Sequence, residues 1–421
     1  MIPEIRIADY TYSLPEERIA RFPLEKRDSS RLLVATSATG FTPAADTFSN
    51  IPKWIPENSF MVFNEAKVVP ARLIFRRRTG AEIEIFCLEP ETPSDYQQNF
   101  ASTSSCRWKV MIGNGRRWKG DEPLNIAISG RTGRCSDAES RLAELDLTAR
   151  RGAGGDSVVE FAWDGGLSFS EVLSLCGNIP IPPYLKRESL PLDSERYQTL
   201  YARREGSVAA PTAGLHFTGE VLYELDRRGV TRESLCLHVG AGTFLPVKSE
   251  TIAGHTMHCE PFEVSRRMLA SLIAAIKEGR PVTAVGTTST RCLESLYFIG
   301  AGVLEGGAPQ AVPQWGPYRD EGYDYTALEA LSALLGWMER SGADSLVART
   351  GIIIVPSYRF RITDYLVTNF HQPQSTLLLL IAAFAGEKWH DLYKFALEND
   401  FRFLSYGDSS LLENIRRDEK L

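Results

Sequence analysis

The stretch SRRMLASLIAAIKEGRPVTAVG, residues 265–286, decides the fold class that the sequence predicts. Residues 265–278 have the apolar spacing of an amphipathic helix, and residues 281–286 are a short apolar run typical of a buried strand. The same alternation continues on both sides. Further helices are expected at 168–176, 194–201, 218–228, 376–385 and 389–398, and further strands at 31–35, 60–64, 234–239, 352–355 and 363–369. Strands that alternate with helices predict an α/β domain.

Between residues 60 and 162 the pattern changes to short runs with period-two alternation. These runs lie at 71–76, 81–88, 107–112 and 157–161, with Gly, Asn, Asp and Ser between them. They predict a small antiparallel barrel or sandwich, and the polar stretches 97–105 and 150–156 are expected to be loops. With 421 residues the chain is long enough for two domains. Residues 303–350, with an expected helix at 327–341, look like an insertion.

The charge balance is slightly acidic. The chain carries 47 lysines and arginines against 53 aspartates and glutamates, a net charge of -6. This does not favour nucleic-acid binding, for which a basic domain is the usual sign, although a local basic patch can do the same work. Two arginine-rich clusters exist: Arg76, Arg77 and Arg78, and a second between residues 107 and 119. Each is either a solvated strand face or a phosphate-binding patch.

Cysteine usage and hydropathy bear on the compartment. The seven cysteines form no CxxC pair, and their odd number argues against a disulfide framework. No apolar run approaches the ~20 residues that span a bilayer, and the first residues lack the apolar core of a secretory signal. We therefore expect a cytoplasmic protein with reduced thiols.

The segment GSVAAPTAGLHFT, residues 206–218, is the densest signal for a binding site. Small side chains let a backbone approach a ligand closely, and Thr218 is typical of a helix N-cap. The functional interpretation is a loop that holds a ligand, with His216 pointing into it. The alternative is a tight turn with a packed histidine.

Two weaker signals follow. LHVGAGTFLPV, residues 237–247, leads from a strand into Gly240, Gly242 and Thr243, but Pro246 prevents a following helix, so a dinucleotide site is not predicted. HTMHCE, residues 255–260, contains two histidines, a cysteine and a glutamate, but its spacing matches neither a zinc protease nor a zinc finger. We expect no metal site there.

Two other segments bring polar groups to the ends of expected strands. AVGTTSTRCLES, residues 284–295, has Thr287 and Thr288 at a helix start, where N–H groups and hydroxyls suit a carboxylate or phosphate; an ordinary helix cap is the alternative. TNFHQPQST, residues 368–376, carries Asn369 and His371 at a strand end. In α/β proteins such ends line the ligand crevice, although a plain strand-to-helix turn would look similar.

Taken together, these segments resemble the S-adenosylmethionine:tRNA ribosyltransferase-isomerase family of queuosine synthesis. The most specific matches are GSVAAPTAGLHFT and the pattern TNFHxPxSTLL. The resemblance continues, in the family's order, in YSLPEERIARFPLEKRDSSRLLV, FNEAKVVPARL, IPIPPYLKR, ERYQTLYA, LHVGAGTFLPV, HTMHCEPFEV, AVGTTSTRCLESL and FRFLSYGDSSLL.

The resemblance implies a mixed α/β main domain, residues 1–59 and 163–421, with a small antiparallel β-barrel domain, residues 60–162, inserted near the N-terminus. It also implies the reaction. The ribosyl part of S-adenosylmethionine is transferred and isomerised onto 7-aminomethyl-7-deazaguanine in tRNA. Epoxyqueuosine-tRNA forms, and adenine and methionine leave. S-adenosylmethionine is then a co-substrate, and we expect no cofactor, no metal and a monomer.

This chemistry needs a base, because the sulfonium makes the neighbouring 5′ carbon acidic. His216 is the first candidate, since histidine titrates near neutrality, and His238 and His371 follow. An aromatic wall beside the sulfonium is also expected. The residues expected to bind the substrate are Ser207, Pro211, Thr212, Gly214, Phe217, Gly240, Gly242, Thr243, Thr287, Thr288, Asn369 and Tyr184, with Phe217 and Tyr184 as the wall. The residues expected to bind tRNA are Arg76, Arg77, Arg78, Arg203 and Arg204.

The chain departs from the family's pattern at a few positions. Glu65 and Ala66 stand where Asp-Thr is usual, Ser357 where Gly is usual, and Gln372 and Gln374 where Leu and Lys are common. These departures leave two alternatives open. One is a diverged paralogue that uses S-adenosylmethionine on another acceptor, and the other is a non-catalytic tRNA-binding protein.

Overall fold

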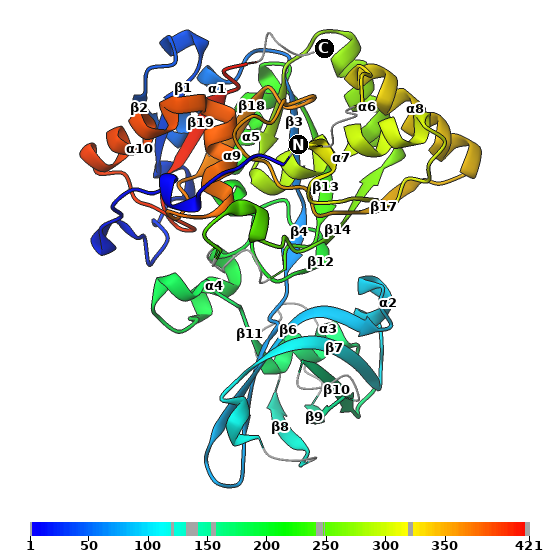
Figure 1. Cartoon of the computed structure of the whole chain (residues 1–421). Helices are drawn as coiled ribbons and strands as arrows, with labels where there is room; N and C mark the ends of the chain where they lie inside the picture. Colours follow the sequence, from blue (N-terminus) through cyan, green and yellow to red (C-terminus); the bar gives the residue numbers. More distant parts are fainter. Residues whose placement is uncertain are drawn as a thin grey trace.

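The computed structural model contains a ten-stranded, a seven-stranded and a two-stranded sheet. In Figure 1 the ten-stranded sheet and its helices form the upper part of the molecule, and the seven-stranded sheet forms the lower part. The residues described are 2–118, 122–131, 142–152, 157–240, 247, 249–318 and 323–416.

The ten-stranded sheet is mixed, with a parallel centre. Its strands, from one edge to the other, are β16 (Ala311–Val312), β17 (Ser345–Thr350), β14 (Glu260–Ser265), β13 (Thr231–Leu237), β3 (Phe60–Asn64), β15 (Val282–Val285), β18 (Tyr365–Asn369), β19 (Ser409–Glu413), β1 (Arg31–Ala35) and β2 (Ala44–Thr47). The four central strands β13, β3, β15 and β18 run parallel. Their carboxyl ends therefore meet at one edge of the sheet.

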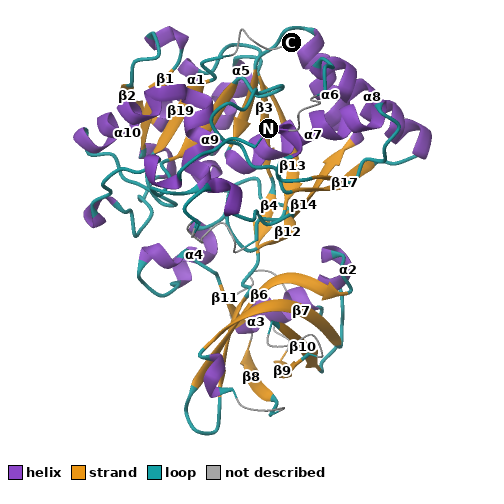
Figure 2. Ribbon diagram, viewed as in Figure 1, coloured by secondary structure: helices purple, strands orange, loops and turns teal. Residues whose placement is uncertain are grey.

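Helices cover both faces of this sheet (Figure 2). The central strand β3 shows why: Phe60 and Val62 enter one core, and Met61 and Phe63 enter the other. Strands buried on both faces read as continuous apolar runs. The first core is closed by α6 (Arg266–Lys277), α7 (Thr287–Leu304), α8 (Ala327–Ser341), α9 (Thr376–Ala385) and α10 (Trp389–Glu398), and the second by α1 (Ile51–Trp54) and α5 (Gly219–Arg227).

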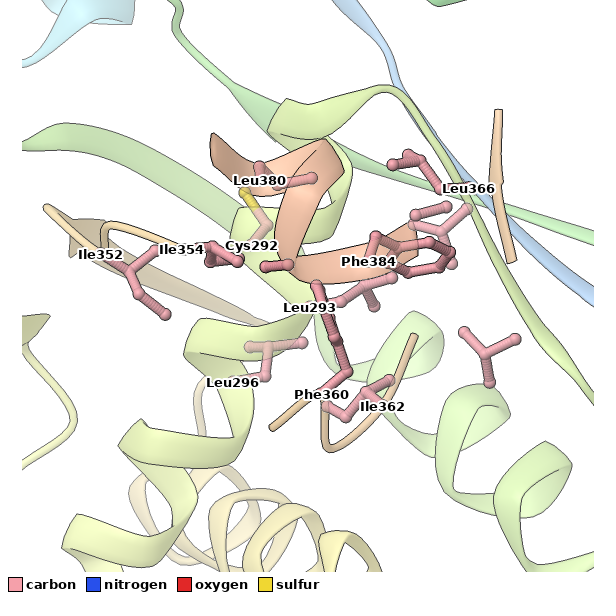
Figure 3. Close-up of a cluster of buried hydrophobic side chains, with 14 of the residues drawn as sticks. Cys292, Leu293, Leu296, Ile352, Ile354, Phe360, Ile362, Leu366, Leu380 and Phe384 are labelled. Carbon is pink, nitrogen blue, oxygen red and sulfur yellow. The ribbon is translucent and has the colours of Figure 1, made fainter. Parts of the chain in front are cut away.

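Helix α7 is fixed deep inside the first core (Figure 3). Cys292, Leu293 and Leu296 project from it and are fully buried. Their neighbours in this cluster include Ile352, Ile354, Phe360, Ile362, Leu366, Leu380 and Phe384. Burying each large apolar side chain contributes roughly 1.5–3 kcal/mol. The position of the start of α7 is therefore set by many contacts.

The seven-stranded sheet is antiparallel and curls around its own core. Its order is β11 (Gly177–Asn178), β5 (Arg72–Arg76), β6 (Glu82–Thr92), β7 (Ser105–Gly113), β10 (Val158–Trp163), β9 (Leu142–Arg151) and β8 (Leu124–Arg131). The curl brings β5 close to β8 without pairing them in the sheet. The concave face packs on Phe169, Val172 and Leu173 of α3 (Phe169–Cys176), while α2 (Tyr96–Phe100) lies beside β6. The result is a half-barrel.

A short parallel pair of strands lies between the two larger sheets. β4 (Ala66–Val68) pairs with β12 (Arg204–Ser207). In Figure 1 both lie where the chain passes between the upper and lower parts. Beside them is α4 (Pro191–Arg196), whose Asp193 accepts from the N–H of Leu190 and forms an ion pair with Arg187 at 2.7 Å.

The structure confirms the predicted mixed α/β class with a curled antiparallel sheet. The helices expected at 327–341, 376–385 and 389–398 have the predicted ends. Four assigned elements lie on the other side of the boundaries expected at 60 and 162. β3 belongs to the ten-stranded sheet and β4 pairs with β12, whereas β11 belongs to the seven-stranded sheet and α3 packs in the half-barrel. The domain division itself stays a prediction.

Three local predictions were wrong. Residues 352–355 are buried but form no strand, because their N–H groups bond outside a ladder: Ile353 to the carbonyl of Gln314 and Val355 to the hydroxyl of Tyr318. Part of the loop expected at 97–105 is helix α2, capped by Asp95. The helix expected at 194–201 is α4, which starts earlier because proline occupies its first turn.

Candidate functional site

A pocket lies at the carboxyl ends of the parallel strands. It encloses about 920 Å³, counted out to the open solvent at its mouth. Its walls come from four segments that are far apart in sequence. They are lined by Ala209 to Ala213, by Gly286, Thr287, Thr288 and Arg291 of the α7 region, by Thr368 to Gln372 with Ser375 and Leu377, and by Leu404 and Ser405, with Tyr184, Tyr197 and Val239 completing the wall.

The 206–218 segment supplies the wall of small side chains, as expected. Pro211 and Thr212 line the pocket with the neighbouring alanines. Two glycines of this segment are needed for a different purpose. A Cβ on Gly206 would come within 2.5 Å of His238 Nδ1, and one on Gly214 within 1.9 Å of the Tyr201 hydroxyl. These two glycines make room for protein side chains. They do not line the pocket.

Two other predicted residues of this segment lie outside the pocket wall. Ser207 is buried, donates to the carbonyl of Ala209 at 2.7 Å and accepts from the N–H of Val239 at 3.1 Å. Phe217 packs edge-on against Phe48 and Phe63 in the second core. Ser207 therefore ties the segment to the end of β13, and Phe217 anchors it to the sheet.

His216 is buried behind the pocket. Its Nδ1 lies 2.8 Å from Ser30 Oγ, and its Nε2 lies 3.2 Å from Asn369 Nδ2. Burial, followed by the nearby charges of Arg402 and Arg27, lowers its pKa to about 3. The imidazole is therefore neutral at pH 7, and Nε2 can accept from the amide of Asn369.

Asn369 lies between His216 and the pocket and contacts both. Its Nδ2 also lies 3.2 Å from the carbonyl oxygen of Leu404. These acceptors fix the amide orientation, since only the NH₂ end can donate to them. Its Oδ1 is buried and has no hydrogen-bond partner among the described residues, and the residue lines the pocket. The amide thus presents an unused acceptor.

His371 lines the pocket itself. The Thr368 hydroxyl lies 3.4 Å from the carbonyl oxygen of Asn369 and 3.0 Å from Nε2 of His371. If the hydroxyl donates to the carbonyl, it accepts from Nε2–H, and on this basis we assign the lone pair of the ring to Nδ1. Burial lowers the pKa of His371 to about 3, so this ring is neutral as well. Its backbone is fixed on both sides: the carbonyl accepts from the hydroxyl of Tyr12, and the N–H donates to the hydroxyl of Tyr393.

His238 lies away from the pocket lining. Its ring stacks on Tyr96 of α2, with centroids 4.4 Å apart and an interplanar angle of 8°. Burial lowers its pKa to about 4. The contact joins the end of β13 to a helix of the half-barrel. Beyond it, Gly240 donates its N–H to Glu260 Oε1 at 3.2 Å, and the predicted residues Gly242 and Thr243 lie outside the described residues.

Several pocket residues escaped prediction from sequence. Arg291 and Tyr197 line the pocket, and Nη2 of Arg291 is buried without a partner among the described residues. Ser405 accepts or donates at 2.5 Å to the hydroxyl of Tyr184, which was predicted and does line the pocket. Burial raises the pKa of Tyr184 to about 12, so the phenol is neutral. The only sequence signal for Arg291 was its place one turn after Thr287.

The arginines predicted to bind tRNA lie in two places. Arg76 and Arg77, on and just after β5, pair with Glu82 and Glu122. Arg78 is exposed and has no ion pair within the described part of the chain. Arg204 on β12 pairs with Glu65 at 3.3 Å and also with Glu263, while the neighbouring Arg203 is exposed.

Within the described residues, no group of three or more His, Cys, Asp or Glu side chains could hold a metal ion. None of their helices is long and apolar enough to cross a membrane.

A ligand pocket at the carboxyl ends of parallel strands, with neutral histidine and tyrosine side chains around it, defines an α/β protein that binds a small molecule at a sheet edge. The family profile described as "Queuosine biosynthesis protein" matches residues 7–412. The chain belongs to this family and is an enzyme of the S-adenosylmethionine:tRNA ribosyltransferase-isomerase type.

The relatives support this over nearly the whole length. The S-adenosylmethionine:tRNA ribosyltransferase-isomerase of Carboxydothermus hydrogenoformans is 38% identical over 97% of this chain and 100% of its own. The enzyme of the same name from Rhizobium johnstonii is 38% identical over 97% and 99%. The crystal structure of S-adenosylmethionine tRNA ribosyltransferase from Thermotoga maritima is 26% identical, covers 96% of this chain and 99% of that chain, and has a TM-score of 0.45.

Proposed function

We propose that the pocket at the carboxyl ends of β3, β13, β15 and β18 binds S-adenosylmethionine and is where its ribosyl group is transferred to 7-aminomethyl-7-deazaguanine in tRNA. The product is epoxyqueuosine-tRNA, and adenine and methionine are released. The observation that carries this proposal is convergence: segments 209–213, 286–291, 368–375 and 404–405 all line one pocket.

We assign the base to His371, in preference to the other histidines. It lies on the pocket wall, and its Nδ1 has the lone pair. A neutral imidazole suits a cationic donor, because an imidazolium would repel the sulfonium. The base takes the proton from the 5′ carbon next to the sulfonium.

His216 is then a positioning residue. It accepts from Asn369 Nδ2 and so keeps Oδ1 of that amide toward the pocket. Oδ1 is an acceptor, so its partner must be an N–H or O–H donor. The exocyclic amine of adenine and the neutral aminomethyl group of the acceptor both provide one. Tyr184, whose ring lines the pocket, remains our candidate for the aromatic surface beside the sulfonium.

We propose that tRNA reaches this pocket across the half-barrel. Arg76, Arg77 and Arg78 are on its surface, and phosphates could replace the glutamates that now pair with the first two. The wobble base lies in a single-stranded loop, so stacking and base-edge contacts should recognise it. Arg203 and Arg204, between the two sheets, are the second candidate contact.

The remaining expectations are also proposals. We infer a monomeric, cytoplasmic enzyme with two domains and no cofactor besides its co-substrate. Of the departures from the family pattern, only Gln372 lines the pocket. Glu65 accepts from Ser234 at 2.7 Å and pairs with Arg204, so it acts beside the β4–β12 pair. The departures therefore leave most of the pocket wall unchanged.

The direct test is incubation with S-adenosylmethionine and tRNA that carries 7-aminomethyl-7-deazaguanine. Adenine release and the mass of the modified nucleoside are measured on the same sample. We expect one adenine for each nucleoside that gains the ribosyl-derived ring. Adenine release without that mass would indicate another acceptor. tRNA binding without adenine release would indicate a non-catalytic binder.

A further inference from the structure

The start of helix α7 forms one wall of the pocket and is not capped by the protein. Gly286 precedes it with φ +90°, and no side chain accepts from its first N–H groups. Helices α3, α5, α6, α8 and α9 each have a serine or threonine N-cap whose side chain accepts such a bond. The first N–H groups of an 18-residue helix and its dipole favour an anion.

A buried arginine on the first turns of α7 points to the same chemistry. Arg291 is 5% exposed and lines the pocket. Its Nη1 donates to Glu260 Oε2 at 2.5 Å and its Nε to the carbonyl of Ile352 at 3.1 Å. Its Nη2 is buried and has no partner within the described structure. Leaving such a donor unsatisfied costs roughly 1–3 kcal/mol or more, since the group is charged.

A second unpaired polar atom lies one turn earlier. Thr288 lines the pocket, and its Oγ1 is buried without a partner among the described residues. The wall therefore offers a guanidinium N–H, a hydroxyl and helix N–H groups together. A group with two acceptor oxygens and a negative charge would satisfy them. Glu260 already balances the charge of Arg291, so the attraction for an anion comes from the unpaired N–H of Arg291, the hydroxyl and the helix N–H groups.

We propose that Arg291, Thr288 and the first N–H groups of α7 form the subsite for the α-carboxylate of the amino-acid arm of S-adenosylmethionine. This rests on the proposed function, because it assumes that the donor occupies this pocket. A backbone phosphate of tRNA is the competing anion. The burial of Arg291 favours the smaller ligand, since a phosphodiester would bring its two flanking nucleosides into the pocket.

Two ligands that differ only in this group test the proposal. S-adenosylmethionine and decarboxylated S-adenosylmethionine are compared by isothermal calorimetry on the full-length protein. The variants are Thr288→Val, which keeps the shape and removes a hydroxyl with no internal partner, and Arg291→Lys, which keeps a charge beside Glu260. The control is Ser295→Ala, one turn further along α7, where the hydroxyl bonds to the backbone carbonyl of Arg291 and to Thr350 but does not line the pocket.

We expect the wild type to bind S-adenosylmethionine roughly 10- to 100-fold more tightly than its decarboxylated form, as for a hydrogen bond to a charged group. Arg291→Lys should remove most of this difference by weakening only the carboxylated ligand, and Thr288→Val should remove part of it. Ser295→Ala should leave it unchanged. The affinity of each variant for the decarboxylated ligand shows that the pocket is still folded.

Two results would overturn the subsite. One is an equal loss for both ligands in Arg291→Lys together with an unchanged preference in Thr288→Val, which would mean a structural role. The other is an unchanged preference in both variants with weaker tRNA binding, which would assign the anion to a phosphate. If the wild type bound neither ligand, the proposed donor pocket itself would be wrong, and the subsite with it.

Discussion

The two large sheets of this enzyme hold charged side chains in different ways. At the carboxyl ends of the parallel strands, Arg291 and Asn369 are buried, and each has one polar atom without a partner among the described residues. On the half-barrel, arginines and lysines project into water and pair with glutamates of the same sheet. Examples are Arg72 with Glu84, Arg76 with Glu82, Arg107 with Glu91 and Lys109 with Glu89.

This difference indicates which part of the enzyme selects its small-molecule substrate and which part attracts nucleic acid by charge. Exposed pairs are worth about 0–1 kcal/mol each, so a phosphate can displace a glutamate at little cost. A buried group without its hydrogen bond is costly, so it favours only a ligand that completes it. The pocket should therefore discriminate between small molecules, and the half-barrel should attract nucleic acid with little selectivity.

The largest effect should come from the pocket wall. His371→Gln should lower the single-turnover rate of adenine release by roughly 10²–10⁴-fold, because a positioned base is lost. The affinity for S-adenosylmethionine should change little. His390→Gln, an exposed histidine on α10, is the matched control. Near-normal turnover in His371→Gln would remove this residue as the base.

The next effect concerns acid stability. The ordinary pKa of histidine is 6.5, and burial lowers it to about 3 for His216 in the folded protein. Below pH 6.5 the unfolded chain therefore binds the proton more readily, so stability is full above this pH and falls as the pH drops toward 3. One such group contributes a slope of about 1.4 kcal/mol per pH unit.

Urea unfolding at pH 7.5, 6.0 and 5.0 measures this slope. His216→Gln should make the loss between pH 6 and 5 shallower by about that amount, because glutamine does not titrate. All six histidines lie outside residues 72–178, so this pH dependence belongs to the ten-stranded sheet and its surroundings. An unchanged slope would show that His216 accepts a proton in the folded state.

A smaller effect is expected on the half-barrel. Replacing Arg76, Arg77 and Arg78 by Ala should weaken tRNA binding by roughly tenfold and make its salt dependence shallower, while S-adenosylmethionine affinity stays the same. Glu82→Gln should do the reverse, because it frees Arg76. Filter binding at several salt concentrations measures both. Arg227→Ala on α5 is the control, and a triple variant with wild-type tRNA affinity would reduce the cluster to a solvated face.

The smallest effect tests a departure from the family pattern. Ser357 has φ +86°, a conformation that glycine adopts more easily. Ser357→Gly should raise the free energy of unfolding by up to about 1 kcal/mol, with no change in turnover. Thermal unfolding of the variant and the wild type under the same conditions measures this difference in stability. A loss of stability would mean that the serine side chain contributes more than the strain costs.

Much of the fold could be predicted because its signals are local. The run from Thr376 to Ala385 is apolar and follows a capping serine, and its helix has the predicted bounds. Strands β8 and β9 were missed, although Leu124 and Ile126, and Leu145 and Leu147, alternate with polar residues. The prediction of a strand at residues 352–355 was wrong because a short apolar run indicates burial but does not by itself distinguish a strand from a buried loop. Which groups accept their N–H bonds depends on a distant loop.

The sequence by itself predicted that strands and helices alternate, that short antiparallel strands near the N-terminus form a small barrel or sandwich, and that small residues with Asn369 and His371 form the site. Only the tertiary structure decided which histidine meets the pocket. Residues His216 and His371 both follow recognisable motifs, but one ring packs behind Asn369 and the other faces the cavity. Side-chain direction at a strand end depends on what the neighbouring strands bring there, and that is set by sheet order rather than by the motif.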